Sequence, residues 1–368
     1  MTNTTIAHQR LYNQHISADP FERPAEVVQW LAAVQAQDFA GAKWALSLRL
    51  RAATDASVEQ AFTEGAILRT HVLRPTWHFV TPADIHWLLA LTAPRVHALN
   101  APYYRKLELD RDLFQRSTTA LEQALQDGKQ LTRDEVRGVL AQAGIATAGE
   151  LRMSYILMRA ELDGVVCSGA RRGKQFTYAL LHERAPQVRH LEHDQAVAEL
   201  ALRFFLSRGP ATVQDFARWS GLTVADARAG LAAVKGQLQH ELVDGQAYWR
   251  SPSMPARPDR PPAAMLMSIY DEYISGYKDR NAMIAPSYGA KLQALGNALT
   301  AIIVVDGQVV GTWKRTLKKD AVVVTTDIFA PLTNAQSHAM AKAIDQYAAF
   351  LQLPVLPPAA STSHATFE

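Results

Sequence analysis

The fold is decided by residues 131–180, which read LTRDEVRGVLAQAGIATAGELRMSYILMRAELDGVVCSGARRGKQFTYAL. Thr132 has the side chain of a helix N-cap, and a run of basic residues separates two short β-prone segments. The expected elements are helices over 133–143 and 150–163 and strands over 165–168 and 175–180. Two helices followed by a hairpin with a basic tip predict a winged-helix unit.

The same order of elements returns on both sides of this stretch. Downstream, Thr212 and Thr223 are typical N-caps and Asp244–Gly245 is a typical hairpin turn, which predicts helices over 213–220 and 224–235 and strands over 238–243 and 246–250. Upstream, the expected elements are a helix over 22–44, a second over 42–51, a third over 58–62 behind Ser57, and a ribbon over 67–80 interrupted at Arg74–Pro75. Three similar units in series are the main structural prediction.

A proline-rich stretch over 251–262 separates these units from the C-terminal part. There we expect antiparallel strands over 301–305, 309–313 and 321–328, a helix over 334–351, and a disordered tail after Pro354. The sequence therefore predicts an α+β, mainly α fold of tandem winged-helix (helix-turn-helix) domains with a C-terminal antiparallel β/α portion. The expected domains are 1–125, with Gln35 and Gln37; 126–190, with the basic wing; 191–255; 263–356; and a tail over 357–368.

Composition places the chain among globular proteins. Of its 368 residues, 48% are hydrophobic and 20% charged, and no apolar run reaches the roughly 18 residues that suggest a membrane span. The N-terminus lacks the features of a secretory signal, and the single Cys167 excludes an internal disulfide or a cysteine metal cluster, so we expect a cytoplasmic protein. A net charge of +3 permits a nucleic-acid partner without requiring one.

The common catalytic signatures are missing, including a Gly-rich phosphate loop, metal-binding His/Glu/His spacing and a Gly-x-Ser-x-Gly elbow. His71, His78 and His86 are close in sequence, but a strand and an adjoining loop would point them in different directions. We therefore expect structural histidines, no metal and no cofactor. Gln35 and Gln37 lie where an apolar helical stripe ends, and composition alone would make them amides that cap backbone groups.

Four stretches nevertheless resemble, in order, the blocks of the AlkZ-like winged-helix bacterial DNA glycosylases: VVQWLAAVQAQDFAGAKWALSLRLR, ILRTHVLRPTWHFV, IYDEYISGYKDRNAMI and VVDGQVVGTWKR. The resemblance implies a monomeric, C-shaped protein that removes N7-alkylated purines from double-stranded DNA, with interstrand crosslinks unhooked by some members. It also implies a nucleoid-associated protein of DNA repair, with self-resistance and general repair both open. The family's signature of Gln, an apolar residue, then Gln or Asp matches Gln35, Ala36 and Gln37, which assigns catalysis to the two glutamines.

Chemistry is compatible with this assignment. A purine alkylated at N7 already carries positive charge, so its glycosidic bond breaks without a general acid. Amide oxygens can place a water and stabilise the sugar cation, whereas a neutral amide is a poor general base. We therefore expect a modest monofunctional enzyme confined to labile substrates.

Each of the remaining candidate site residues has a functional and a structural interpretation. Arg171, Arg172, Lys174 and Gln175 form the expected DNA-contacting wing, or an ordinary solvated turn. Asp38, Arg74, Trp77 and His78 would line the lesion pocket, with Trp77 as a core residue and Arg74 as a surface turn residue in the alternative. The charged run Asp271, Glu272, Lys278, Asp279 and Arg280 is interpreted as a salt-bridged surface that braces the domains.

Two other functions stay open at this point. Repeated winged helices more often read DNA than cut it, which would make the chain a non-catalytic regulator or lesion sensor. The weak net charge would also suit winged helices that contact proteins. DNA binding that weakens as salt rises would exclude the protein-contact function.

Overall fold

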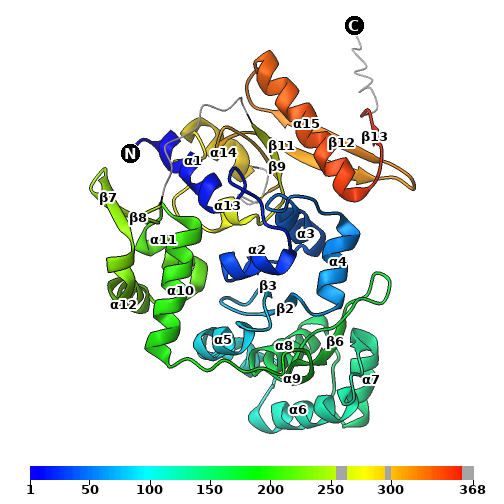
Figure 1. Cartoon of the computed structure of the whole chain (residues 1–368). Coiled ribbons are helices and arrows are strands. Elements are labelled where there is room, and N and C mark those ends of the chain that lie inside the picture. Colours follow the sequence, from blue (N-terminus) through cyan, green and yellow to red (C-terminus); the bar gives the residue numbers. More distant parts are fainter. Residues whose placement is uncertain (254–262, 295–299, 359–368) are drawn as a thin grey trace, which may run out of the picture.

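The computed structural model describes residues 1–253, 263–294 and 300–358 (Figure 1). The first helices are α1 (Asn3–Asn13), α2 (Pro24–Leu31), α3 (Phe39–Ser47), α4 (Asp55–Thr63), α5 (Ile85–Lys106), α6 (Arg111–Leu125), α7 (Arg133–Gln142) and α8 (Glu150–Leu162). The later helices are α9 (Leu181–Arg184), α10 (His193–Arg208), α11 (Val213–Ser220), α12 (Val224–Val234), the 3-10 turn η1 (Lys235–Gln237), α13 (Glu272–Ser275), α14 (Pro286–Ala294) and α15 (Asn334–Leu351).

The strands form four small sheets among the described residues. One has the order β1-β3-β2, from Val34–Gln35, Trp77–Val80 and Leu68–His71. A second has the order β4-β6-β5, from Leu131–Thr132, Thr177–Leu180 and Val166–Ser168, and a hairpin pairs β7 (Gln239–Val243) with β8 (Gln246–Arg250). The last has the order β13-β12-β11-β10-β9, from Val355–Leu356, Val322–Ile328, Gln308–Leu317, Ile302–Val305 and Ala264–Met267.

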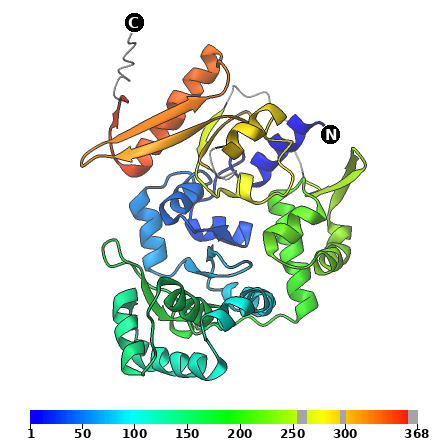
Figure 2. The same cartoon turned by 180° about the vertical axis from the view of Figure 1, so that it is seen from behind.

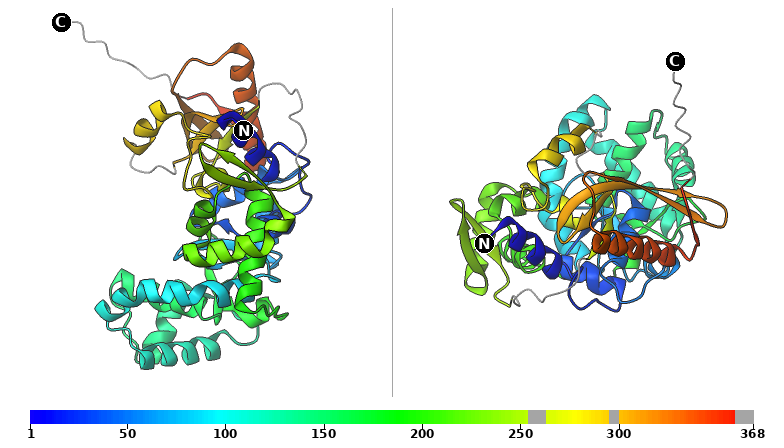
Figure 3. Two further views of the ribbon diagram at one scale, coloured as in Figure 1. Left: turned by 90° about the vertical axis from the view of Figure 1, so that its left-hand side faces the viewer. Right: turned by 90° about the horizontal axis from the view of Figure 1, so that it is seen from above.

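These elements make an α+β fold in which helices dominate, as the sequence predicts. The C-terminal sheet and α15 lie at one end and α6 and α7 at the other, with α2 and β3 between them (Figures 1 and 2). Seen from the side, α14 and α5 extend to the same side of the molecule, which gives the ribbon a C-shaped outline (Figure 3, left).

The elements predicted from residues 131–180 are present and in order. Thr132 caps α7 and accepts a hydrogen bond from the Glu135 N–H, and Glu135 bonds back to the Thr132 N–H. This reciprocal pair is a capping box, which depends only on residues three apart and is therefore readable from sequence. The same holds for the boxes at Thr212 and Thr223 that begin α11 and α12.

The prediction of one helix over 22–44 is wrong. α2 ends at Leu31, Ala32 has a positive φ of 61°, and the chain then enters β1 before α3 begins at Phe39. Apolar residues at helical spacing continue past Leu31 because this segment is buried on both sides, not because it is helical. The predicted N-cap Ser57 is also displaced: Thr54 caps α4 and Ser57 is its capping-box partner.

The C-terminal part agrees with the predicted helix over 334–351, and three of its strands were expected. β9 was missed, and Val355–Leu356 corrects the prediction of a disordered tail after Pro354, since these residues pair with β12. The tail over 359–368 and most of the linker, 254–262, lie outside the described residues. The described helices include none that is both long and apolar enough to cross a membrane.

One continuous hydrophobic core joins the first unit, the third unit and the C-terminal sheet. Trp44 of α3 packs against Tyr347 of α15 and donates its indole N–H to the Leu266 carbonyl of β9 at 2.5 Å. The buried Arg49 binds both oxygens of Asp271 at 2.9 and 3.2 Å. The C-terminal part is therefore fixed to α3 and the residues after it, which follow the two glutamines in the chain.

Candidate active site around Gln35 and Gln37

Gln35 is the last residue of a short strand in the central three-stranded sheet, and Gln37 lies two residues beyond it. β1 pairs with β3 so that Gln35 lies opposite His78, and the Ala36 N–H donates to the Trp77 carbonyl at 2.7 Å. Ala36 is fully buried, Gln35 is 9% exposed and Gln37 is exposed. The alternation of an extended chain directs the apolar middle residue to the core and the two amides to the other side.

Each glutamine carbonyl accepts a hydrogen bond from the β2–β3 hairpin. Arg74 donates from Nη2 to Gln35 Oε1 at 3.3 Å, and the Trp77 N–H donates to Gln37 Oε1 at 3.4 Å. Gln37 does cap a backbone group, but that group belongs to a strand and not to a helix end. A carbonyl oxygen has two lone pairs, so each amide can accept one further bond, for instance from a water.

Glu272 fixes the backbone of Gln35 from the C-terminal part of the chain. Its Oε1 accepts the Gln35 N–H at 3.0 Å, and its Oε2 accepts the Trp219 indole N–H at 2.9 Å. The same Oε2 accepts two bonds from Arg208, at 3.1 and 2.8 Å. Glu272 and Arg208 are both fully buried, so this ion pair is far from solvent.

Arg208 completes the clamp on the segment before Gln35. It donates to the carbonyls of Leu31 and Ala33 at 2.9 and 3.0 Å, which are the groups released where α2 ends. Burial lowers the pKa of Arg208, and the Glu272 carboxylate opposes that shift. The expectation that the 271–280 run braces the domains agrees with these contacts, but Asp271 and Glu272 are buried rather than a surface.

His78 lies beneath the site and is fully buried. Its Nδ1 is 2.9 Å from the Thr76 carbonyl, so Nδ1 carries the proton and Nε2 is a bare acceptor with no partner among the described residues. Burial lowers the pKa of His78 well below its usual value, with Arg74 adding to the effect. Gln35, His78 and Thr70 are cross-strand neighbours, so a row of polar side chains runs across the sheet behind Gln35.

The other face of the hairpin connects the site to the second unit. Arg69 donates to the Ala36 carbonyl at 3.1 Å, and its guanidinium lies 4.4 Å from the centre of the Trp77 ring. Burial lowers the pKa of Arg69 to about 10. Trp77 donates its indole N–H to Glu161 of α8 at 3.3 Å, and Glu161 also contacts His71. Trp77 is thus held on both sides, and its orientation depends on α8.

Two of the four wing residues already pair with acidic side chains of the protein. Arg171 is 3.3 Å from Glu59 of α4, and Arg172 is 2.8 Å from Glu135 of α7. Lys174 and Gln175 are exposed. Of the four predicted wing contacts, these two carry no competing ion pair among the described residues.

Asp38 is half-buried at the N-cap position of α3, without a capping hydrogen bond. Its Oδ2 would lie 2.6 Å from a Cβ at Gly41, so glycine is required there for close approach. Within the described ranges, no group of three or more potential metal-binding side chains occurs.

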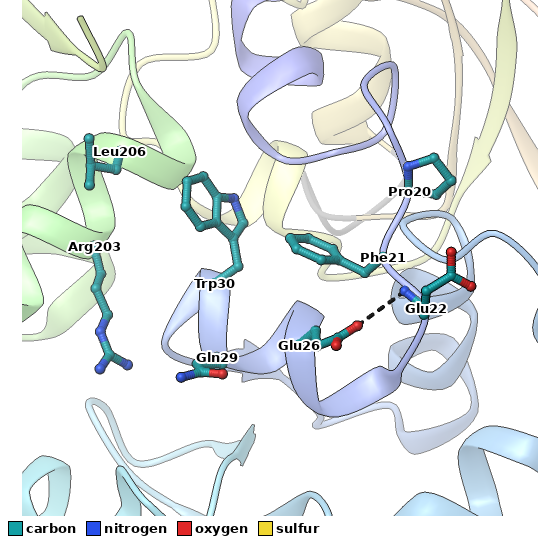
Figure 4. Close-up of a pocket in the computed structure, with 8 residues that line it drawn as sticks. All are labelled: Pro20, Phe21, Glu22, Glu26, Gln29, Trp30, Arg203 and Leu206. Atoms are coloured by element: carbon teal, nitrogen blue, oxygen red, sulfur yellow. Dashed lines mark hydrogen bonds between the residues drawn. The ribbon is translucent and has the colours of Figure 1, made fainter. Parts of the chain in front are cut away.

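A pocket of about 570 Å³ lies elsewhere, between α2, α10 and the 20–22 segment (Figure 4). Trp30 and Phe21 supply its aromatic wall, and Glu26 is bonded to the Glu22 N–H at 3.1 Å. Neither glutamine lines this pocket, so it is separate from the candidate site.

Glu272, Arg208 and Trp219 were missed by sequence reasoning as parts of the site. The available signal was the block around Asp271 and Glu272, two adjacent acids that are the N-cap and the first residue of a short helix that is buried throughout. Arg208 ends a long helix and gives no local signal of burial.

Comparison with known proteins identifies the class. Residues 28–350 match the model of the family described as "DNA glycosylase AlkZ-like". The protein is a DNA glycosylase, and its substrate is DNA. It belongs to the AlkZ-like family, as the four sequence blocks indicated.

Two relatives from Streptomyces sahachiroi illustrate the similarity. An interstrand DNA cross-link repair glycosylase is 25% identical over 319 residues, covering 83% of this chain and 85% of that protein. The solved structure of the DNA glycosylase AlkZ superposes with a TM-score of 0.79 at 23% identity, covering 97% of this chain and 100% of that one. The second comparison shows a shared fold, and family membership favours an enzyme over a non-catalytic DNA-binding protein.

Proposed function

We propose that this enzyme hydrolyses the N-glycosidic bond of purines alkylated at N7, without a cofactor. Gln37 orients the attacking water and Gln35 stabilises the sugar cation. The base leaves as a neutral alkylated purine, the water oxygen bonds to the anomeric carbon as a water proton passes to solvent, and an abasic site remains. Because the leaving base is already cationic in the substrate, no acid has to protonate it.

The observation that carries this proposal is the fixed geometry of the two amides. Each carbonyl oxygen accepts one bond from the β2–β3 hairpin, at 3.3 Å for Gln35 and 3.4 Å for Gln37, and retains one lone pair. Anchored amides stabilise developing charge without having to reorganise during the reaction. The buried clamp of Glu272 and Arg208 keeps the backbone of the pair in place.

The rest of the molecule would hold the DNA. We propose winged-helix domains over 1–125, 126–190 and 191–255 and a C-terminal portion over 263–356, acting as a monomer. Contacts come from the wing residues Arg171, Arg172, Lys174 and Gln175, and the lesion pocket includes Asp38, Arg74, Trp77 and His78. Lys174 and Gln175 are the most accessible of the wing, and His78 acts from beneath the pocket because it is buried.

A bulky lesion also belongs to the proposed substrates. The relative named an interstrand DNA cross-link repair glycosylase aligns with 83% of this chain at 25% identity. We propose that the present enzyme unhooks interstrand crosslinks attached through N7 of a purine, since a groove-side approach does not require the linked base to be flipped out.

Base release tests the proposal. Purified protein is incubated with a duplex that contains N7-methylguanine, and free base is quantified against time under single-turnover conditions. We expect Gln37→Ala and Gln35→Ala to lose roughly tenfold or more in rate, the loss typical of one positioned stabilising group. Gln123→Ala, an exposed glutamine on α6, is the matched control and should match the parent protein. Equal release by Gln37→Ala and the parent would refute the catalytic assignment.

A further inference from the structure

Three arginines gather beside Gln35 without acidic partners. Arg74 comes from the β2–β3 connection, Arg218 from α11 and Arg280 from the segment after α13. Among the described residues, no carboxylate lies within 4.0 Å of any of their guanidinium nitrogens. Arg74 and Arg280 are half-buried and Arg218 is exposed, whereas the half-buried Arg203 and the fully buried Arg49 and Arg208 each have a carboxylate partner.

Backbone packing brings the three segments together. Arg74 donates from Nη1 to the Arg218 carbonyl at 3.2 Å while its Nη2 reaches Gln35. At Gly221, just after α11, a Cβ would lie 2.4 Å from the Leu73 carbonyl oxygen, so this turn touches the β2–β3 connection directly. Arg280 donates from Nε to the Ile274 carbonyl at 3.1 Å, two residues beyond Glu272.

Nearby carboxylates are already occupied. Glu272 is saturated by Arg208, Trp219 and the Gln35 N–H. Asp215 accepts from Thr212 at 2.9 Å and from the Lys278 N–H at 2.7 Å. Burial lowers the pKa of both Arg74 and Arg280, and the charge of Arg218 adds to each shift. The cluster is therefore an excess of positive charge next to the site, and an anion would relieve it.

We propose that Arg218 and Arg280, backed by Arg74, bind the DNA phosphate adjacent to the damaged nucleotide. This inference rests on the proposed function, because it takes Gln35 and Gln37 to mark the position of the reacting sugar. The phosphates of that nucleotide are attached to the same sugar, so anchoring one of them sets the distance between the anomeric carbon and the amides. Phosphate–guanidinium pairs are well suited to this because two N–H groups can bind two oxygens.

The phosphate also resolves a charge conflict. A cationic purine would be repelled by three unpaired guanidinium groups in a partly desolvated site. A backbone phosphate carries one negative charge and reduces that repulsion when DNA binds. The enzyme would thus present a site suited to a cationic base only when that base arrives as part of a DNA strand, and free N7-alkylated nucleosides, which keep the cationic base but lack the phosphate, would be poor ligands.

The test compares binding by Arg218→Ala and Arg280→Gln with that of the parent and of Arg116→Ala. Arg116 is an exposed arginine of α6 that is paired with Asp112. The probe is a duplex with a non-hydrolysable abasic analogue, so binding is measured without any base release. We expect roughly tenfold weaker binding by each variant and a salt slope smaller by about 1. Arg116→Ala should leave both quantities unchanged.

A methylphosphonate scan locates the phosphate. Neutral linkages are placed one at a time around the abasic analogue, and the affinity of each protein is measured. We expect one position where the neutral linkage weakens the parent but barely affects Arg218→Ala, since both changes remove the same contact. If inorganic phosphate competes with the probe, but the neutral linkages weaken binding to the same extent at every position, the arginines form a general anion site. That result would overturn the proposal. Unchanged salt slopes in both variants would also overturn it, and neither outcome depends on whether the glutamines are catalytic.

Discussion

Replacing Glu272 by alanine should destabilise the protein strongly, because four hydrogen bonds end on one buried carboxylate. The variant leaves the Arg208 guanidinium buried without its counter-ion and leaves the Gln35 N–H and the Trp219 indole N–H without acceptors. Breaking a buried ion pair from one side costs about 3–5 kcal/mol. Each orphaned neutral donor adds up to about 1–3 kcal/mol, but such losses overlap, so we expect about 4 kcal/mol in total.

A second variant tests the charge of Glu272, and a third serves as a surface control. Glu272→Gln keeps one carbonyl acceptor for the Gln35 N–H and loses the charge that balances Arg208, so it should cost less than the alanine variant but more than about 1.5 kcal/mol. Glu22→Ala is the matched control, since the Glu22 side chain is 64% exposed and pairs with the exposed Arg51. A surface pair of this kind is worth about 0–1 kcal/mol.

The assay is equilibrium unfolding in urea, followed by tryptophan fluorescence, with the free energy of unfolding obtained by linear extrapolation. Base release by the Glu272→Gln variant, measured where it is fully folded, should fall in maximal rate more than in DNA affinity, because Glu272 acts on the position of Gln35 and not on DNA. A Glu272→Ala variant within 1 kcal/mol of Glu22→Ala would refute the reasoning.

Three other predictions follow from single residues. The folded-state pKa of His78 lies well below its usual value, so at acidic pH the unfolded chain binds a proton that the folded chain does not. The free energy of unfolding should therefore fall as pH drops below about 6.5, by up to about 1.4 kcal/mol per pH unit. Urea titrations at several pH values should show a smaller slope for His78→Gln. Gly221→Ala should cost more than about 1 kcal/mol by thermal unfolding, because φ is 73° and the new Cβ would meet the Leu73 carbonyl; Gly128→Ala, also at positive φ but in open space, shows the backbone contribution alone. Burial raises the pKa of Cys167 to about 12, so iodoacetamide should label it only after denaturation, and labelling of native protein at pH 8 would contradict its buried position.

Local chemistry explains which parts of the fold were predictable. The capping boxes at Thr132, Thr212 and Thr223 involve residues three apart, and the helices behind them begin where the sequence predicted. β1 is different, because Gln35 becomes a strand residue only through pairing with His78, 43 positions later. A two-residue strand has no periodicity of its own, so the apolar pattern of α2 was extended across it.

The candidate site was likewise only partly predictable from local sequence. Gln35 and Gln37 were selected because their surroundings resembled a family, while their chemistry alone would have suggested capping. Glu272 was interpreted as part of a charged surface because its partner Arg208 is 64 positions away and no spacing relates them. Buried ion pairs of this kind are visible only once the packing that buries them is known.

The charges around the glutamines argue that positioning, more than basicity, sets the rate. Both amides are neutral, His78 beneath them is uncharged, and Glu272 is committed to Arg208. Neither amide can take a proton from water as a carboxylate would, so in the proposed mechanism the attacking water is activated mainly by the cationic sugar itself. If bond breaking precedes attack, the proposed site would gain nothing from a stronger base, and it would spare undamaged purines because their glycosidic bonds do not break first. Replacing Gln37 by a carboxylate, Gln37→Glu, should therefore raise the rate on N7-methylguanine only a fewfold and leave unmodified DNA uncleaved. Measurable release of ordinary guanine by that variant would mean that the enzyme, and not the lesion, supplies the driving force.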